Sequence, residues 1–171
     1  MALNFAKAIN INDNDVKNTL TFSSQFNLND NTESEPTPPP HTSSNMWDGI
    51  TDIVKYYYIT ASGGLTRSMS YFYVETYFSV ESGKSYVFWG EKKSDGQISK
   101  SNRIYWYDES QGFIERGAFS DYQKTALVAP DNAKYMRVCS NIDSTEVSDE
   151  LIASYNWYVG EGTEDTEYEP Y

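Results

Sequence analysis

The feature that most constrains the fold is a repeated pattern of short aromatic stretches separated by turn-forming residues. It is clearest at residues 103–107, where charged, β-branched and aromatic side chains alternate, and Asp108, Ser110 and Gly112 follow. β-branched and aromatic side chains suit a pleated, half-buried surface, and Asp, Ser and Gly supply turn chemistry. This stretch therefore predicts a strand that enters a hairpin.

The same pattern recurs through most of the chain after residue 46. It predicts strands at 54–60, 71–80, 85–89, 103–107, 112–116, 133–140 and 154–159. Strong turn signals stand between them, at 62–64, 82–84, 95–96 and 130–132. Only 146–153 has the pattern of a helical turn, with a loop as the alternative. Many short strands without a helical period predict an all-β fold, a jelly-roll-like antiparallel β-sandwich with an extended N-terminal arm.

Composition divides the chain into three segments. Residues 1–29 are rich in Asn and poor in large apolar side chains, which indicates an anchoring arm that does not fold alone. Residues 30–45 form a Pro-rich linker, and its consecutive prolines 38–40 favour a stiff polyproline II spacer, with an SH3-type ligand as the alternative. Residues 46–171 hold nearly all the aromatic side chains and are expected to be the sandwich domain.

Charge and cysteine content narrow the classes of partner. The formal net charge of −12 argues against nucleic acid and anionic membranes, because both require a basic surface. No apolar run approaches the length of a membrane span, and no secretion signal follows Met1. If the protein works outside the cell that made it, export by assembly or lysis is expected. The only cysteine, Cys139, excludes an internal disulfide and is expected to be a buried thiol.

Several kinds of catalytic and cofactor site lack their parts. The only histidine is His41 in the linker, which removes Ser-His-Asp triads, Cys-His pairs and histidine-based zinc sites. Residues 83–85 resemble the end of a phosphate-binding loop, but Phe78 occupies the position of the first glycine. We expect no cofactor and no enzyme activity. Glycoside hydrolysis by a carboxylate pair stays open, because 25 acidic residues offer many pairs.

A calcium loop is the one metal site that the N-terminal region suggests. Residues 12–15 alternate Asn and Asp, as the start of such a loop does. In the register that begins at Asp13, however, Asn18 stands where the turn glycine belongs and Ser24 where the bidentate Glu belongs. We therefore expect no metal site.

Outward-facing aromatic residues predict a glycan-binding surface at Trp89, Arg103, Tyr105 and Tyr107. Side chains alternate along a strand, so the last three share one face of residues 103–107. Sugars place apolar C–H faces against aromatic rings and need fixed polar partners for their hydroxyl groups. The alternative is that these rings fill a second layer of the sandwich or a subunit interface.

Other prominent residues are expected to be structural. Trp47, Trp106 and Trp157 are predicted to lie in the core. Arg137 lies on a predicted strand and is expected to pair with an acid at the rim of the sandwich, for which Asp108 is the candidate.

The C-terminal part, about residues 80–171, carries a series of motifs in a characteristic order. They are Gly-Lys-Ser-Tyr at 83–86, Ile-Tyr-Trp-Tyr-Asp at 104–108 with Gly-Phe-Ile at 112–114, Ala-Pro-Asp-Asn-Ala-Lys-Tyr-Met-Arg-Val at 129–138, Gly-Glu-Gly-Thr at 160–163 and Tyr-Glu-Pro-Tyr at 168–171. This series resembles the carbohydrate-binding-module-like jelly-roll domains of bacteriophage tail and fibre proteins, including minor tail, baseplate and receptor-binding proteins. The N-terminal arm and proline spacer depart from the pattern of longer tail proteins, which leaves a capsid location open.

The resemblance implies a bacteriophage virion protein of the tail, baseplate or fibre whose sandwich binds host surface glycan for adsorption. Its expected partners are other virion proteins, through the arm, and a host glycan, with homo-oligomers such as trimers. The alternatives are a capsid fibre or decoration protein without sugar binding, and a glycan-degrading enzyme.

Overall fold

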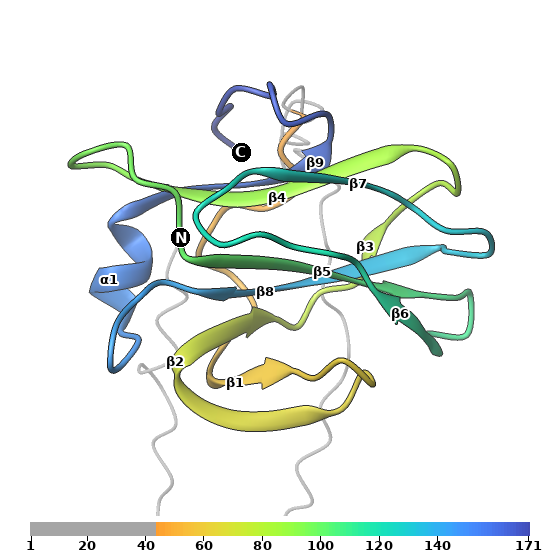
Figure 1. Cartoon of the computed structure of the whole chain (residues 1–171), viewed down its shortest axis with the longest axis horizontal. Helices are drawn as coiled ribbons and strands as arrows, with labels where there is room; N and C mark the ends of the chain where they lie inside the picture. Colours follow the sequence, from red (N-terminus) through yellow and green to blue (C-terminus); the bar gives the residue numbers. More distant parts are fainter. Residues whose placement is uncertain (1–43) are drawn as a thin grey trace, which may run out of the picture. The chain divides into compact units, whose positions relative to one another are not determined.

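The computed structural model describes residues 44–171. The expected arm and all but the last two residues of the expected linker lie outside the described residues, as do His41 and the rejected calcium loop. The described part folds into two antiparallel β-sheets packed face to face, with one short helix at an end (Figure 1). This arrangement confirms the predicted all-β sandwich.

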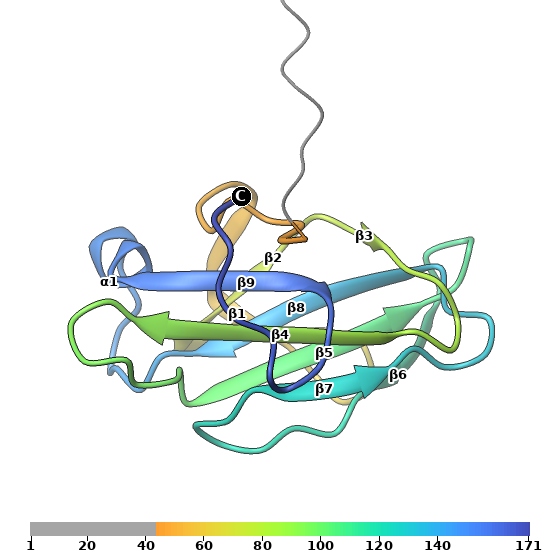
Figure 2. The same cartoon turned by 90° about the horizontal axis from the view of Figure 1, so that it is seen from above.

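Short strands follow one another along the described part of the chain. In order they are β1 (Ile53–Ile59), β2 (Leu65–Val74), β3 (Phe78–Ser79), β4 (Ser85–Lys92), β5 (Ser101–Tyr107), β6 (Phe113–Arg116), β7 (Thr125–Val128), β8 (Tyr135–Asn141), α1 (Asp149–Ala153) and β9 (Tyr155–Glu161). The larger sheet has the strand order β1-β2-β8-β5-β6, with β3 also paired to β8. The smaller sheet has the order β7-β4-β9 and lies over the larger one (Figure 2).

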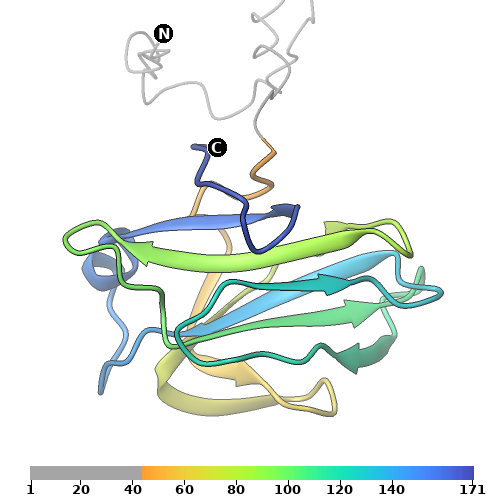
Figure 3. The same ribbon diagram turned by 45° about the horizontal axis from the view of Figure 1, so that its top comes forward.

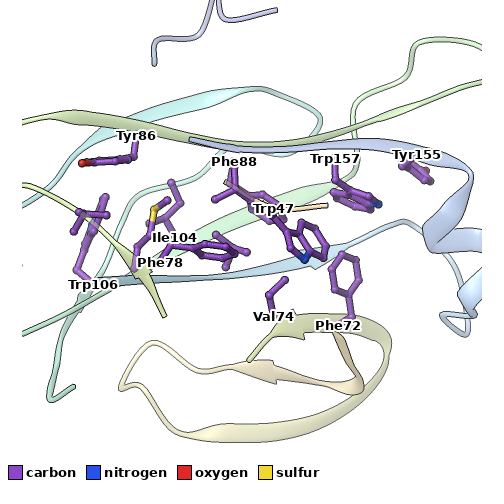
Figure 4. Packing of buried hydrophobic residues seen from close by; sticks show 14 of the residues in the cluster. Trp47, Phe72, Val74, Phe78, Tyr86, Phe88, Ile104, Trp106, Tyr155 and Trp157 are labelled. Atoms are coloured by element: carbon purple, nitrogen blue, oxygen red, sulfur yellow. The ribbon is translucent and has the colours of Figure 1, made fainter. Parts of the chain in front are cut away.

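The main core lies between the two sheets and is largely aromatic. Alternate residues of β4 and β9, such as Phe88 and Trp157, meet alternate residues of β2 and β5, such as Phe72 and Trp106 (Figure 4). Trp47 also reaches into this layer from the segment before β1. The three tryptophans predicted to be core residues are each at most 3% exposed, which confirms that prediction.

Trp157 is the centre of this packing. Its ring stacks on Phe88 with centroids 5.8 Å apart and on Tyr155 at 5.3 Å, and it meets Phe72 edge-on at 5.1 Å. The opposite residue on β4 is Gly90, and an added Cβ there would come within 2.3 Å of the Trp157 ring. The glycine therefore lets the large indole lie flat against the backbone of the neighbouring strand.

An irregularity in the pairing of β1 with β2 allows β1 to contribute to two layers. Between the pairs Lys55–Phe72 and Tyr57–Arg67, β2 has four residues and β1 has only Tyr56, which adopts a positive φ of 68°. The regular alternation of side chains is interrupted at this point. Tyr56 consequently packs against the main core, while Tyr58 packs against a second cluster on the outer face of the larger sheet.

The segment before β1 is tied to β9 through Asn45. Its Oδ1 accepts hydrogen bonds from the backbone N–H of Val159 at 3.0 Å and of Trp47 at 3.3 Å, and its Nδ2 donates to the Trp157 carbonyl at 2.8 Å. Asn45 is 1% exposed. The sequence places this residue at the end of the linker, whereas the described structure makes it part of the folded domain.

The expected turns lie where the structure turns, but the predicted strands differ in part from the observed ones. The segments 62–64, 82–84, 95–96 and 130–132 each separate two strands, and Gly63, Gly83, Gly96 and Asn132 have the positive φ that such turns use. The predicted strand 71–80 divides into the end of β2 and the separate β3. The first half of β2 and all of β7 were not predicted.

The helical turn expected within 146–153 is present as α1. Ser148 caps its first turn and accepts a hydrogen bond from the N–H of Leu151 at 3.2 Å.

Candidate ligand-binding surface

The structure does not bring the four predicted site residues together. Trp89 lies on β4 in the smaller sheet, whereas Arg103, Tyr105 and Tyr107 lie on β5 in the larger sheet. All four side chains point away from the main core, as the alternation predicts, but the two sheets turn their outer faces in opposite directions. The expected single patch that includes Trp89 is therefore corrected to two separate surfaces.

Trp89 is also not exposed. Its ring stacks on Tyr158 with centroids 5.7 Å apart and an interplanar angle of 12°, and Tyr168 from the C-terminal segment meets it edge-on. The ammonium of Lys124 lies 3.9 Å from the ring centroid. Trp89 is 0% exposed, so the expectation that it offers an open stacking platform is wrong.

The C-terminal segment 162–171 covers this outer face of the smaller sheet (Figure 3). Glu169 accepts hydrogen bonds through Oε2 from the backbone N–H of Ser44 at 3.0 Å and from its hydroxyl at 2.8 Å. The hydroxyl groups of Ser44 and Tyr158 are 2.7 Å apart. These contacts link the first described residues, the last residues of the chain and the ring that stacks on Trp89.

Acid should loosen this link. The hydrogen bonds from Ser44 lower the pKa of Glu169 below its usual 4.5, so the stabilising contribution is present above that value. It is lost as the pH falls through the lowered folded-state pKa. We expect the protection of residues 162–171 against hydrogen exchange, taken relative to the intrinsic exchange rate at each pH, to fall below about pH 4 in the native chain, given the usual glutamate pKa.

In the variant Glu169→Gln the same loss of protection should already be present at neutral pH, and the protection should change little with acid. The matched control is Glu167→Gln, which changes an exposed neighbour and should keep the native pH dependence. Identical profiles for Glu169→Gln and the native chain would show that the carboxylate does not hold the segment.

Tyr105 and Tyr107 are buried as a second layer on the outer face of the larger sheet. They are 0% and 4% exposed, in a cluster that includes Ile59, Tyr73 and Cys139. The β1–β2 hairpin curls over this face on the side away from the smaller sheet (Figures 1 and 3). The expectation that these two rings are accessible is therefore wrong, and the second-layer alternative describes them.

Specific contacts hold the hairpin against the sheet. The Tyr105 hydroxyl donates a hydrogen bond to the Ile59 carbonyl, and burial raises the tyrosine pKa. At the tip, Gly63 has a φ of 83°, and an added Cβ would lie 2.5 Å from the Phe113 ring. Only a residue without a side chain allows this approach. Burial also raises the pKa of Cys139 to about 12, in agreement with the buried thiol that the sequence predicts.

Arg103 is the predicted site residue that remains partly exposed. Its guanidinium carbon lies 4.9 Å from the ring centroid of Tyr71, 4.5 Å from that of Phe119 and 5.8 Å from that of Tyr58. Its Nη2 donates to the Tyr71 hydroxyl at 2.7 Å, and its Nε donates to the hydroxyl of Ser101 at 3.0 Å. All three rings are half-buried. We call these four residues, Tyr58, Tyr71, Arg103 and Phe119, the Arg103 surface.

A polar group adjoins this surface at the start of β5. The exposed Tyr122 donates to the Asp143 carboxylate at 2.6 Å, and Lys100 donates to the same carboxylate at 3.1 Å. These two hydrogen bonds lower the pKa of Asp143. A backbone bridge between Ser101 and Asp121 joins this group to the Arg103 surface. Aromatic rings with fixed donors and acceptors beside them have the chemistry that sugar recognition requires.

Arg137 has a different partner from the one predicted. Its guanidinium carbon lies 4.8 Å from the centroid of Tyr73 and 4.9 Å from that of Tyr77. Asp108 instead caps its own turn, where Oδ1 accepts from the N–H of Ser110 at 2.9 Å and of Gly112 at 2.8 Å. The predicted Arg137–Asp108 pair is therefore wrong. The cation lies beside two rings, that of Tyr73 from β2 and that of Tyr77 from the segment between β2 and β3.

Acidic side chains line two depressions in the surface of residues 44–171. One, of about 590 Å³, is lined by Ser44, Met46, Ser79, Tyr86, Glu161 and Gly162. Its one acid, Glu161, forms an ion pair with Lys84 at 3.0 Å. A second depression of about 290 Å³ includes Asp108 and Glu109, and the turn hydrogen bonds lower the pKa of Asp108. A general acid in glycoside hydrolysis requires a raised pKa.

Neither a cluster of metal ligands nor a membrane-spanning helix is present in residues 44–171. No group of three or more His, Cys, Asp or Glu side chains in this range is arranged to hold a metal ion. The same range contains no helix that is long and apolar enough to cross a membrane.

The sequence contains only some of the signals that could have located the Arg103 surface. Tyr58 and Tyr71 lie on predicted strands, and Arg103 was singled out. Their approach depends on the curl of the β1–β2 hairpin, and Phe119 comes from a loop without any strand pattern.

Comparison of the chain with protein-family models, curated proteins and solved structures gave no match.

Proposed function

We propose that this chain is a bacteriophage virion protein of the tail, baseplate or fibre, and that its sandwich binds a host surface glycan during adsorption. The proposal draws on the motif series at 80–171 and on the antiparallel sandwich. In this proposal residues 1–45 attach the chain to other virion proteins and homo-oligomers present several copies of the domain. A capsid fibre or decoration protein without sugar binding is the second proposal.

The observation that carries the glycan proposal is the Arg103 surface. Tyr58, Tyr71 and Phe119 are each partly exposed, and Arg103 holds them in place by cation–π contacts and a hydrogen bond. Fixed rings accept a sugar with little loss of side-chain entropy. The other predicted residues, Trp89, Tyr105 and Tyr107, support the layers beneath the two outer faces and do not contact ligand in this proposal.

Replacement of one ring should weaken binding of the full-length chain to host surface polysaccharide. We expect Tyr71→Ala to weaken binding about tenfold, because a ring contact worth roughly 1.4 kcal/mol is lost. Isothermal titration with polysaccharide purified from the host surface measures this effect. The thermal midpoint of each variant, measured in parallel, separates lost binding from lost folding.

The matched control is Tyr57→Ala. Tyr57 is 39% exposed and is the chain neighbour of Tyr58, but it points to the opposite face of β1. Its replacement should leave binding unchanged. Equal losses for the two variants would overturn the assignment of the surface. No binding by the native chain, with normal incorporation into particles, would support the decoration protein instead, and release of reducing ends would support the enzyme.

A further inference from the structure

Positive charges on the described domain divide into two groups with different environments. The ion pairs within residues 44–171 all use lysines, namely Lys55, Lys84, Lys92 and Lys100. In the same range, no Asp or Glu carboxylate lies within 4.0 Å of an arginine side-chain nitrogen. Lys93, Lys124 and Lys134 form no ion pair in this range either, but arginine is the cationic residue type of which no member is paired with a carboxylate.

Three of these arginines gather on the outer face of the larger sheet. Arg116 on β6 and Arg137 on β8 are the two register partners of Tyr105 on β5. Arg103 lies two residues before Tyr105 and therefore shares its face. The charges of Arg103 and Arg116 both act on the Tyr105 hydroxyl, where they oppose the effect of burial on its pKa. The sheet register thus concentrates positive charge around one tyrosine.

Arg103 and Arg116 converge on a single ring. Their guanidinium carbons lie 4.5 Å and 5.3 Å from the centroid of Phe119. The two charges are therefore separated by no more than about one Debye length at 0.1 M salt, ~10 Å, and repel each other. The ring quadrupole offsets part of this repulsion, but a bound anion would offset more of it. Both arginine side chains are half-buried, so ligand reaches them from solvent.

Arg137 adds charge deeper in the same face. Its Nε is buried and, within the described residues, has no hydrogen-bond partner. The hydroxyl of Tyr107 is also buried without a hydrogen-bond partner in this range. Burial raises the pKa of Tyr107, and the charge of Arg137 opposes this shift. This arginine faces the rings of Tyr73 and Tyr77 in place of a carboxylate. A third arginine therefore lies on the same face as the first two.

We propose that this face recognises an oxyanion carried by the glycan, a carboxylate or a phosphate on the sugar, and that Arg103 and Arg116 bind it beside Phe119. The inference rests on the proposed function and gives its ligand a chemical class. A planar guanidinium offers paired donors that match both kinds of oxyanion. The neighbouring rings of Tyr58 and Tyr71 receive the apolar face of the sugar, so neutral and charged parts of one ligand have separate partners.

The test compares probes that differ only in charge. Isothermal titration of the full-length chain uses oligogalacturonate and its methyl ester, and a mannose oligosaccharide with and without a phosphate monoester. We expect at least one charged probe to bind about tenfold or more tightly than its neutral partner, since an ionic hydrogen bond contributes that much. The preference should fall as salt is raised, because part of it is screened.

Variants at Arg116 test whether this residue causes the preference for the charged probe. Arg116→Ala should remove most of the preference for the charged probe, and Arg116→Lys should restore only part of it, because lysine keeps the charge but not the planar fork. The control is Arg67→Ala, which makes the same change of charge. Arg67 is paired with Tyr57 on the face of the β1–β2 hairpin opposite Tyr58, so its loss should leave the preference unchanged.

The outcomes separate this inference from the function on which it rests. Equal binding of charged and neutral probes, with no effect of Arg116→Ala, would overturn the oxyanion site and leave glycan binding standing. Absence of binding to these probes and to host polysaccharide would overturn both. Arg67→Ala could also reduce the preference for the charged probe as much as Arg116→Ala does. That result would show that the overall charge of the domain, and not a local site, attracts the anion, and it would overturn the inference.

Discussion

Replacement of Trp157 by alanine should destabilise the domain by about 3 to 5 kcal/mol, the usual cost of removing a fully packed large aromatic side chain. Its ring contacts Phe72 from the larger sheet and Phe88 from the smaller one, and its Nε1 donates to the Ile152 carbonyl at 2.9 Å. The substitution therefore leaves a cavity between the sheets and an unpaired carbonyl at the end of α1. Urea denaturation followed by circular dichroism measures the loss in the free energy of unfolding.

The control for this prediction keeps a ring at the same position. Trp157→Phe fills much of the space and should cost clearly less than the alanine variant, because the cavity is smaller. A loss below about 1 kcal/mol for Trp157→Ala would contradict the position of this ring at the centre of the core, because substitutions of that size are typical of exposed sites.

The second large effect is expected at Asn45, where aspartate should destabilise the domain by about 3 kcal/mol or more at neutral pH. The side-chain nitrogen donates to the carbonyls of Trp157 at 2.8 Å and Glu169 at 3.1 Å. A carboxylate has no donor for these carbonyls, and it would place a buried negative charge beside them. The substitution keeps the size and shape of the side chain, so the effect reports hydrogen bonding and charge alone.

The loss should depend on pH with a defined sign. Burial raises the folded-state pKa of the introduced carboxyl group above its unfolded value of about 3.9. The penalty is therefore small below the unfolded pKa and grows as the pH rises towards the folded-state pKa. Denaturant unfolding at pH 4 and pH 7, each compared with the native chain at the same pH, measures this difference.

Asn156→Asp is the matched control for the aspartate substitution. Asn156 lies on β9 next to Trp157 and is only half-buried, so the same change should cost under about 1 kcal/mol and depend little on pH. Comparable losses at the two positions would show that Asn45 does not form the buried link between the segment before β1 and β9.

Local patterns were sufficient for most of the strands and for the direction of their side chains. Trp106 and Tyr105 are neighbours in the chain, so alternation places their side chains on opposite faces of β5. Trp106 lies in the main core and Tyr105 on the outer face. The turn at Gly63 and the turn at Asn132 were predictable because their residue types favour the φ angles that they adopt. The polar first half of β2 was not predictable from its residues. It is a strand because it pairs with β1.

The sequence by itself determined an antiparallel aromatic sandwich and which rings point away from its core. Only the tertiary structure decided whether those rings are accessible. Trp89 is covered by Tyr168 from a distant segment. Tyr105 is covered by the β1–β2 hairpin, in which the Ile59 carbonyl accepts a hydrogen bond from its hydroxyl. Alternation is a local property of the strand, whereas burial depends on segments that arrive from elsewhere in the chain. For the same reason the sequence pointed to Arg103, and only the fold placed Tyr71 and Phe119 around it.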